Sequence, residues 1–402
     1  MSSGFLYNDK IDSTPSQNRI RVLQLIRDKK EITRADIIKG TGLSAPTVTR
    51  IVEALLEKKI IKQDELGSSN GGRPPQIIRF DSKNNFVIGI DISGTFVRAA
   101  FSNLDGEFLY EIHLPIEVER GIDGVMEQVG ELIHKLLNRS NTKKERVFGI
   151  GVSICGIVNN HTGVVDYIPV FNWKNIDVKK ALGKYTDLPI SVGNVAHLIA
   201  QGELLYGIGK KYKSFISINL GYGIGSGIII NGEPFYGADG YSGEIGHIVV
   251  NQESEKKGRE GIYGTLEALA SGYGIVDIAR ERMEAGEVSS LSDQMETLST
   301  TVIMKAAMNG DDLATDLINR SADYIGISID TLIKLFNPEA ITLSGGLSET
   351  GDFFIKKIRK KVASISLPLY KEEIPISVSS FGEEASLMGA FSLILQNILR
   401  LE

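Results

Sequence analysis

Residues 41–50 have the sequence Thr-Gly-Leu-Ser-Ala-Pro-Thr-Val-Thr-Arg, and residues 71–75 have the sequence Gly-Gly-Arg-Pro-Pro. In the first stretch Gly42 suits a turn. Ser44 suits the cap of a helix, because a serine oxygen can accept a hydrogen bond from an unpaired amide of the first turn. Pro46 is tolerated in that turn because its missing amide would have had no partner there. The stretch therefore predicts a turn followed by a helix that begins after Ser44.

The predicted helix has two different faces. Apolar residues at helical spacing form an inner face, which consists of Val48, Ile51, Val52, Leu55 and Leu56. The outer face of the first two turns carries small and polar residues, which are Ala45, Pro46, Thr47, Thr49 and Arg50. Side chains of this size can lie against base edges in the major groove of DNA, so this face is a candidate recognition surface.

The sequence on either side of this helix completes a small domain. Apolar residues at helical spacing predict a first helix over residues 18–28, and a cap at Thr33 predicts a second helix over residues 34–39. Two short strands are expected around the glycine-rich turn, over residues 60–62 and 76–80. Three helices followed by a two-stranded hairpin are typical of a winged helix-turn-helix.

We interpret residues 18–82 as this winged helix-turn-helix DNA-binding domain. Arg34, at the start of the second helix, and Ser44 join the outer face of the third helix as candidate DNA contacts. The alternative is a helix-turn-helix that serves only as a packing module. Residues 1–17 are polar and contain Pro15, and we predict a flexible arm there.

The Gly-Arg-Pro sequence around Arg73 is a separate candidate DNA contact. A glycine and a proline on either side of an arginine give a narrow, extended segment. Such a segment suits insertion of Arg73 into an A·T-rich minor groove, where the negative potential is strongest. An ordinary proline-rich linker is the alternative interpretation.

Charge is distributed unevenly along the chain. The 402 residues carry a formal net charge of −6, yet the first 80 hold 14 Lys and Arg against 9 Asp and Glu. The basic excess lies in the predicted DNA-binding domain, as a nucleic-acid partner requires, although a solvated surface gives a similar excess. The remainder of the chain is acidic.

The rest of the composition is that of a globular protein with a sizeable core. The single cysteine, Cys155, cannot form an internal disulfide, so nothing ties the fold to an oxidising compartment. No apolar run reaches the roughly 18 residues that a membrane helix needs. The N-terminus also lacks the apolar segment of a signal peptide. We therefore expect a cytoplasmic protein without a membrane partner.

After residue 83 the pattern changes to strand, turn and strand, and a similar opening occurs twice. The first copy predicts strands over residues 86–92, 95–103 and 108–113, followed by a helix over 125–137 and a strand over 148–154. The second copy predicts strands over residues 214–220, 225–230 and 234–235. The duplication predicts an α/β protein with a two-lobed, actin-like (RNase H-like) ATPase-type fold, whose turns could hold phosphate from both sides. Glycine is also a common hairpin residue, so the turns alone prove little.

The body resembles the ROK family of repressors, open reading frames and sugar kinases, in particular its transcriptional-regulator branch. The blocks that carry the resemblance are residues 89–95, 149–152, 223–227, 243–247, 266–272 and 344–346. The resemblance extends from about residue 18 to the end of the chain and includes the Gly-Gly-Arg-Pro-Pro segment. It implies a first lobe over residues 83–200 that is joined by a C-terminal helix over about 384–402. It also implies a second lobe over residues 201–383 with dimerisation and sugar-binding motifs.

The resemblance also implies which residues bind a sugar. Glu244 and His247 in the Gly-Glu-Ile-Gly-His block, Glu267, and Asn194 would contact sugar hydroxyls. Charged groups and imidazole suit a polyol, because each buried hydroxyl needs a donor or an acceptor. Without the matching blocks, surface glutamates and a core histidine would be the simpler interpretation.

Two departures from the family pattern concern catalysis. Family kinases have Glu-Asn-Asp-Ala-Asn where this chain has Gly-Asn-Val-Ala-His, so the catalytic aspartate is replaced by Val195. A valine cannot accept a proton from a sugar hydroxyl, and phosphoryl transfer by the family's route should be lost. Val170 likewise stands where relatives usually have a sugar-binding asparagine. We hypothesise that the ligand lacks the hydroxymethyl group of a hexose, as a pentose such as xylose does; a cyclitol or another polyol is the alternative.

Two further expectations concern cofactors, and both are negative. The phosphate turns retain Asp91, Gly94, Thr95, Gly223 and Gly225, but Ser93 replaces a glycine that lets the backbone approach phosphate, so we expect degenerate phosphate loops and no nucleotide cofactor. Relatives hold a zinc ion with a histidine and a Cys-x-Cys-Gly-x-x-Gly-Cys cluster. The matching stretch, residues 256–265, contains no cysteine, so no metal is expected.

These inferences favour a sugar-responsive transcriptional regulator, most simply a repressor of a carbohydrate-utilisation operon. A homodimer, or a tetramer, would place two recognition helices on a pseudo-palindromic operator. A sugar kinase that uses another base is one alternative, and a DNA-binding protein that needs no ligand is another.

Overall fold

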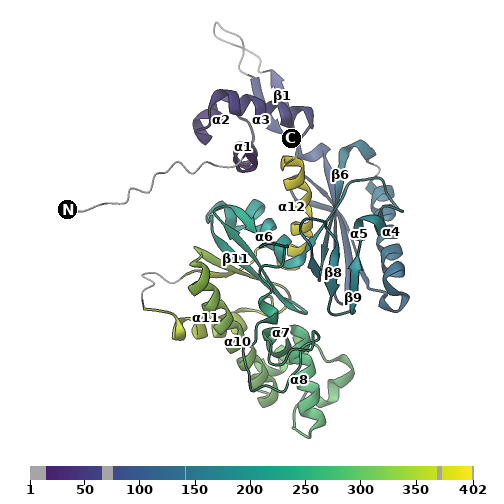
Figure 1. The fold of residues 1–402 in the computed structure, drawn as a ribbon, viewed down its shortest axis with the longest axis vertical. Helices are drawn as coiled ribbons and strands as arrows, with labels where there is room; N and C mark the ends of the chain where they lie inside the picture. Colours follow the sequence, from purple (N-terminus) through teal and green to yellow (C-terminus); the bar gives the residue numbers. More distant parts are fainter. Residues whose placement is uncertain (1–14, 66–75, 141, 369–373, 401–402) are drawn as a thin grey trace, which may run out of the picture.

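The computed structural model describes residues 15–65, 76–140, 142–368 and 374–400. It has three parts, which are an N-terminal domain at one end of the molecule and two α/β lobes (Figure 1). No helix in the described parts of the chain is both long and apolar enough to span a bilayer.

The N-terminal domain has the predicted order of elements. It consists of α1 (Pro15–Lys29), α2 (Arg34–Thr41), α3 (Ala45–Glu57), β1 (Ile61–Glu65) and β2 (Gln76–Phe80). β1 and β2 pair in antiparallel fashion. α1 begins three residues earlier than the predicted arm allows, because proline is readily accepted in the first turn of a helix. The glycine-rich turn and Arg73 lie outside the described residues.

Local hydrogen bonds explain where α2 and α3 begin and end. The Thr33 side chain accepts from the amide of Asp36, and the Asp36 carboxylate accepts from the amide of Thr33, which forms a capping box. Gly42 ends α2 with a φ of 70°, a conformation that costs glycine little. Ser44 caps α3 by accepting from the amide of Thr47 at 3.4 Å. The helix-turn-helix is therefore confirmed, with the expected cap at each of these helices.

The first lobe is built on a five-stranded sheet with the order β10-β6-β3-β4-β5. Its strands are β3 (Phe86–Ile92), β4 (Phe96–Asn103), β5 (Phe108–Pro115), β6 (Val147–Ile154) and β10 (Ile190–Asn194). β3, β4 and β5 form an antiparallel meander, and β6 and β10 continue the sheet in parallel. The other elements are α4 (Gly121–Ser140), α5 (Val178–Leu182) and a small sheet of β7 (Ile157–Val158), β8 (Val165–Ile168) and β9 (Trp173–Ile176).

The second lobe repeats this topology. Its sheet has the order β13-β12-β11-β14-β15 and contains β11 (Phe215–Leu220), β12 (Ile224–Ile230), β13 (Glu233–Phe235), β14 (Ala340–Ser344) and β15 (Ile376–Val378). Again the first three strands are antiparallel and the last two are parallel. The helices are α7 (Leu266–Ala270), α8 (Gly272–Glu284), α9 (Thr300–Met308), α10 (Asp312–Phe336) and α11 (Asp352–Ile365). The predicted duplication is therefore present in the strand order of both sheets.

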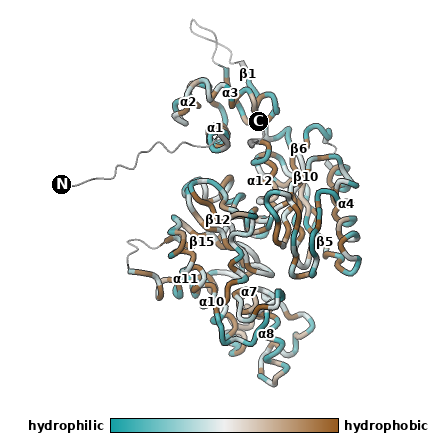
Figure 2. The backbone as a smooth tube through the Cα atoms, in the orientation of Figure 1, coloured by the Kyte–Doolittle hydropathy of each residue, from teal (hydrophilic) through white to brown (hydrophobic). Residues whose placement is uncertain are grey.

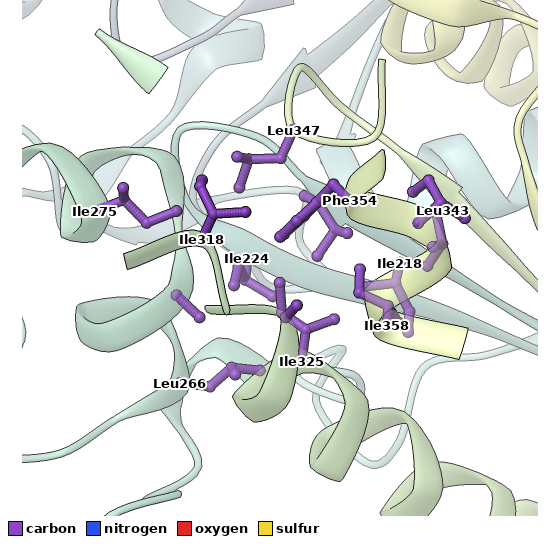
Figure 3. Close-up of a cluster of buried hydrophobic side chains, with 14 of the residues drawn as sticks. Ile218, Ile224, Leu266, Ile275, Ile318, Ile325, Leu343, Leu347, Phe354 and Ile358 are labelled. Carbon is purple, nitrogen blue, oxygen red and sulfur yellow. The ribbon is translucent and has the colours of Figure 1, made fainter. Parts of the chain in front are cut away.

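Each lobe has its own apolar core. In the second lobe, residues from the sheet and from α7, α8, α10 and α11 meet around Phe354, which is fully buried (Figure 3). Figure 2 shows hydrophobic residues along the strands of both lobes and along α12. A third cluster joins the N-terminal domain to the body, because residues of α1, α2 and α3 pack with Leu205 and with Phe391, Ile394, Leu395 and Ile398.

Two helices lie between the lobes and the N-terminal domain. They are α6 (Val195–Tyr206) and α12 (Ala385–Arg400), which lie side by side (Figure 1). The predicted lobe boundary at residue 200 falls inside α6, and α12 packs against α6, β3 and β6. A Cβ atom on Gly389 would overlap the backbone of Leu198, so the two helices touch through their main chains at this crossing.

This contact predicts the effect of one added methyl group. Gly389→Ala should shift the urea denaturation midpoint downward, because overpacking costs about 1–3 kcal/mol. That cost exceeds the gain of about 1 kcal/mol in helix propensity. The control is Gly40→Ala in α2, where the added atom meets only the mobile end of the Leu25 side chain. A Gly389→Ala protein as stable as the parent in circular-dichroism melts would contradict the close crossing.

Candidate ligand cleft and nucleic-acid interface

A cleft with a volume of about 740 Å³ lies between the two lobes. Every residue that was predicted to contact sugar or phosphate lines it, together with the two valines at the altered positions. The residues concerned are Asp91, Gly94, Thr95, Val170, Asn194, Val195, Gly223, Gly225, Glu244, His247 and Glu267. The fold therefore brings together segments that are far apart in the sequence.

Tight backbone packing positions the acidic residues of the second lobe. Gly243 has a φ of 78°, and a Cβ atom there would overlap the carbonyl of Ser226, so only glycine fits before Glu244. Glu267 lies in the first turn of α7, which Thr265 caps. The carboxylate of Glu267 accepts a hydrogen bond from the amide of Ile224 at 2.8 Å. The protein itself thus holds the Glu267 carboxylate and sets the backbone position of Glu244.

Burial sets the electrostatics of this wall. Burial raises the pKa of Glu244, and the neighbouring Glu267 raises it further, while His247 acts in the opposite direction. Burial also raises the pKa of Glu267. The Nε2 atom of His247 lies 3.6 Å from a carboxylate oxygen of Glu244. The wall offers acceptors to hydroxyl donors and keeps one imidazole within reach of the same ligand.

Asn194 has a structural role in addition to the predicted ligand contact. Its side-chain oxygen accepts from the amides of Ala196 at 2.8 Å and His197 at 3.3 Å, which caps α6. Its side-chain nitrogen donates to the carbonyl of Gly156 at 2.9 Å. Asn194 therefore fixes the start of α6 and uses most of its hydrogen-bonding capacity within the protein.

Val195 and Val170 give the opposite side of the cleft an apolar character. Val195 is the first residue of α6 and is half-buried. A Cβ atom on Gly94 would lie 3.5 Å from a methyl group of Val170, which places Val170 against the first phosphate turn. Neither side chain can hydrogen-bond to a ligand or accept a proton.

The first phosphate turn is closed by its own serine. Ser93 Oγ accepts from the amides of Thr95 at 3.2 Å and Phe96 at 3.0 Å, so these amides already have a partner. The buried Asp91 accepts from Ser386 of α12 at 2.6 Å and lies 3.5 Å from Arg98. These groups of the turn are therefore engaged inside the protein.

An arginine between two tyrosines also lines the cleft, and sequence reasoning missed it. The Arg259 guanidinium lies 4.7 Å from the ring centre of Tyr222 and 4.1 Å from that of Tyr273, and it donates to the Tyr222 hydroxyl. A Cβ atom on Gly94 would lie 3.0 Å from the Tyr222 ring, so this side chain packs against the first phosphate turn. Arg259 belongs to residues 256–265, the stretch that aligns with the zinc cluster of relatives and that contains no cysteine.

The predicted DNA-binding residues lie at the start of α3 and on its outer face. Ser44, Ala45, Pro46 and Arg50 are exposed, and Thr47 and Thr49 are partly exposed. The hydroxyls of Ser44 and Thr47 lie 2.8 Å apart in one hydrogen bond. Arg34, at the start of α2, is partly buried and donates to Gln63 of β1 at 3.5 Å.

Comparison with known proteins identifies both parts. Residues 87–397 match the ROK family, and residues 15–62 match a family described as winged helix-turn-helix DNA-binding. The chain is 27% identical over 384 residues to the xylose repressor of Caldicellulosiruptor bescii. This match covers 95% of this chain and 96% of that protein. The chain is 30% identical over 316 residues to a glucokinase of Halalkalibacterium halodurans, which covers 78% of this chain and 96% of the kinase.

A solved structure extends the match to the whole architecture. The crystal structure of a ROK family transcriptional regulator, described as a homolog of the E. coli MLC protein, aligns with a TM-score of 0.81 at 28% identity. The alignment covers 96% of this chain and 97% of that one, so it includes the N-terminal domain and both lobes. The chain therefore belongs to the ROK family and carries a winged helix-turn-helix DNA-binding domain ahead of the two-lobed body.

Proposed function

We propose that the protein is a sugar-responsive transcriptional repressor whose kinase activity has been lost. The observation that carries the proposal is the composition of the cleft, where acceptors for a polyol are retained and Val195 occupies the position of the base. The similarity to a xylose repressor over nearly the whole chain supports a pentose or a related polyol as the ligand.

The loss of phosphoryl transfer rests on three features of the cleft. Val195 cannot take a proton from a sugar hydroxyl. The amides of the first phosphate turn are bonded to Ser93, and Tyr222 packs over Gly94. A nucleotide would have to displace both side chains. The alternative is a kinase that uses a different base, and the similarity to a glucokinase favours testing it by a direct assay.

Repression requires that the ligand change the position or freedom of the DNA-binding domain. In a homodimer two α3 helices would enter successive major grooves about 34 Å apart on a pseudo-palindromic operator. Sugar binding between the lobes would favour one degree of closure. It can release DNA only if that degree of closure binds the operator less well.

Operator binding is the first test. The operator used is a duplex that the protein itself selects from random sequences. Arg50→Ala should weaken the affinity for this operator by about 10- to 100-fold, because Arg50 faces outward from α3. Fluorescence anisotropy measures this, and Lys356→Ala, an equal loss of charge on the exposed surface of α11, should leave affinity unchanged. Equal weakening by both variants would mean that only general charge matters.

Ligand selectivity is the second test. Calorimetry should show xylose binding about tenfold more tightly than glucose, because the extra hydroxyl of a hexose would face Val195 without a partner. Val195→Asp should reverse the preference, and an aspartate in the first turn of α6 suits the helix N-terminus. Glucose binding as tightly as xylose would remove the pentose hypothesis, and binding of no sugar would favour a ligand-independent DNA-binding protein. A coupled ATP assay with the parent protein should show no turnover.

The raised pKa of Glu244 gives a third test. Above that pKa the buried carboxylate is charged and costs stability, and the cost disappears as the pH falls and the group protonates. Glu244→Gln should therefore raise the melting temperature at neutral pH by about 1–3 °C, with the difference shrinking toward pH 4. The same change should weaken sugar binding about tenfold. Glu253→Gln, on the exposed surface, should do neither.

A contrary result is easy to recognise for Glu244. A Glu244→Gln protein that binds sugar as well as the parent would show that this carboxylate is not an acceptor for the ligand. A lower melting temperature at neutral pH would show that burial does not penalise the ionised form.

A further inference from the structure

The segment over residues 256–265 forms a tight hairpin that borders the cleft. The amide of Gly258 donates to the carbonyl of Ile262 at 2.8 Å, and Lys257 pairs with Tyr263 in an isolated bridge. Gly264, with a φ of 67°, donates to Lys256 at 2.9 Å. In zinc-containing members of the family this segment holds the metal, so its residues decide whether a metal fits here.

The residues do not fit zinc. The pattern Cys-x-Cys-Gly-x-x-Gly-Cys aligns with residues 258–265 so that both glycines match, at Gly261 and Gly264. The three cysteine positions are then Gly258, Glu260 and Thr265, which supply no thiolate. The hydroxyl of Thr265 accepts from Ala268 as the cap of α7. Within the described residues, no cluster of three or more His, Cys, Asp or Glu is arranged to hold a metal ion.

The Glu260 carboxylate instead lies over Gly258. A Cβ atom on Gly258 would lie 2.5 and 2.6 Å from the two carboxylate oxygens of Glu260. The same carboxylate lies 3.4 Å from Nδ1 of His247. A carboxylate therefore occupies the point where side chains from positions 258 and 260 would converge, next to the imidazole.

The Glu260 carboxylate and the His247 ring face each other. Both carboxylate oxygens of Glu260 and the Nδ1 atom of His247 are buried without a hydrogen-bond partner. A buried carboxylate is costly unless a donor or a positive charge faces it. Arg259 is stacked between two tyrosines, and the Lys257 amine lies over the Tyr263 ring at 5.4 Å. The His247 imidazole is the group within ion-pair distance of the Glu260 carboxylate.

We propose that Glu260 is a positioning residue that takes the place of the metal. Its carboxylate orients the His247 ring through Nδ1, so that Nε2 faces Glu244 and the ligand. The hairpin is thereby held against the cleft without a metal ion. This inference deepens the proposed function, because His247 is one of its ligand-binding groups.

The test compares Glu260→Gln with Glu255→Gln, an exposed glutamate in the same segment. Glu260→Gln should weaken xylose binding at least about tenfold in calorimetry, because the His247 ring loses the negative charge that faces Nδ1 at 3.4 Å and orients it. It should also change the ring-nitrogen shifts of His247 in NMR spectra at one fixed pH, assigned with a His247→Gln variant. Glu255→Gln should change neither quantity.

The NMR measurement distinguishes failure of the proposed function from failure of the role of Glu260. If the parent protein binds no sugar, the proposed function fails, while the His247 spectrum still reports on Glu260. Unchanged His247 shifts in a folded Glu260→Gln protein would overturn the inference. So would stoichiometric zinc in the purified parent protein, or a loss of thermal stability on adding EDTA.

A gain-of-metal variant tests the same geometry from the other direction. The combined change Gly258→Cys, Glu260→Cys and Thr265→Cys removes the carboxylate that a side chain at position 258 would meet. The variant should bind one equivalent of Zn²⁺ together with His247 and regain stability when it does. Failure of the folded variant to bind zinc would contradict the placement of the Glu260 carboxylate at the metal position.

Discussion

The main-chain contact between α6 and α12 is the constraint on which the rest of the structure depends. At Gly389 and Leu198 the two helices touch without an intervening side chain, and a Cβ atom on Gly151 of β6 would overlap the carbonyl of Ala390 on the other side of α12. Closely packed interiors rearrange in discrete steps and are not continuously deformable. The two helices and the first-lobe sheet therefore form one rigid unit.

Both helices extend from the cleft to the DNA-binding domain. At one end, Val195 begins α6 and Ser386 of α12 binds Asp91 beside the phosphate turn. At the other end, Tyr206 of α6 stacks under the Arg27 guanidinium at 4.1 Å, and the carbonyl of Ile398 in α12 accepts from Lys58 at 3.0 Å. Under the proposed function, a ligand that changed lobe closure would act on elements that already pack in the core of the N-terminal domain. No separate flexible linker is needed to carry its effect.

Helices, strands and caps are readable from local sequence patterns, whereas most long-range contacts are not. The caps at Thr33 and Ser44 and the duplicated meanders follow from local patterns, and the structure reproduces them. The contact of the C-terminal helix with the N-terminal domain has no local sequence signal, because an apolar helix face does not specify what it packs against. Asn194 was expected at a ligand because of its motif; its cap on the amides of Ala196 and His197 is local, whereas its hydrogen bond to the carbonyl of Gly156 is long-range and appears only in the fold. The contacts of Arg259 and Glu260 were not predicted, because these residues lie where the cysteine motif of relatives is absent and no other motif marks them.

The acidic wall of the cleft argues against simple decay of an old active site. Glu244 and Glu267 are held at raised pKa by burial, and Glu260 is buried without a hydrogen-bond partner. Each of these groups costs stability in a protein that has only a small margin. Mutations that remove such groups are common and would be stabilising, so a cleft without a ligand should lose them. Under the proposed function, Val195 stands at the catalytic position, while the costly groups that suit sugar hydroxyls are present. Costly polar groups beside an apolar residue at the position of the base are what the proposed function requires, namely binding of a ligand without turnover.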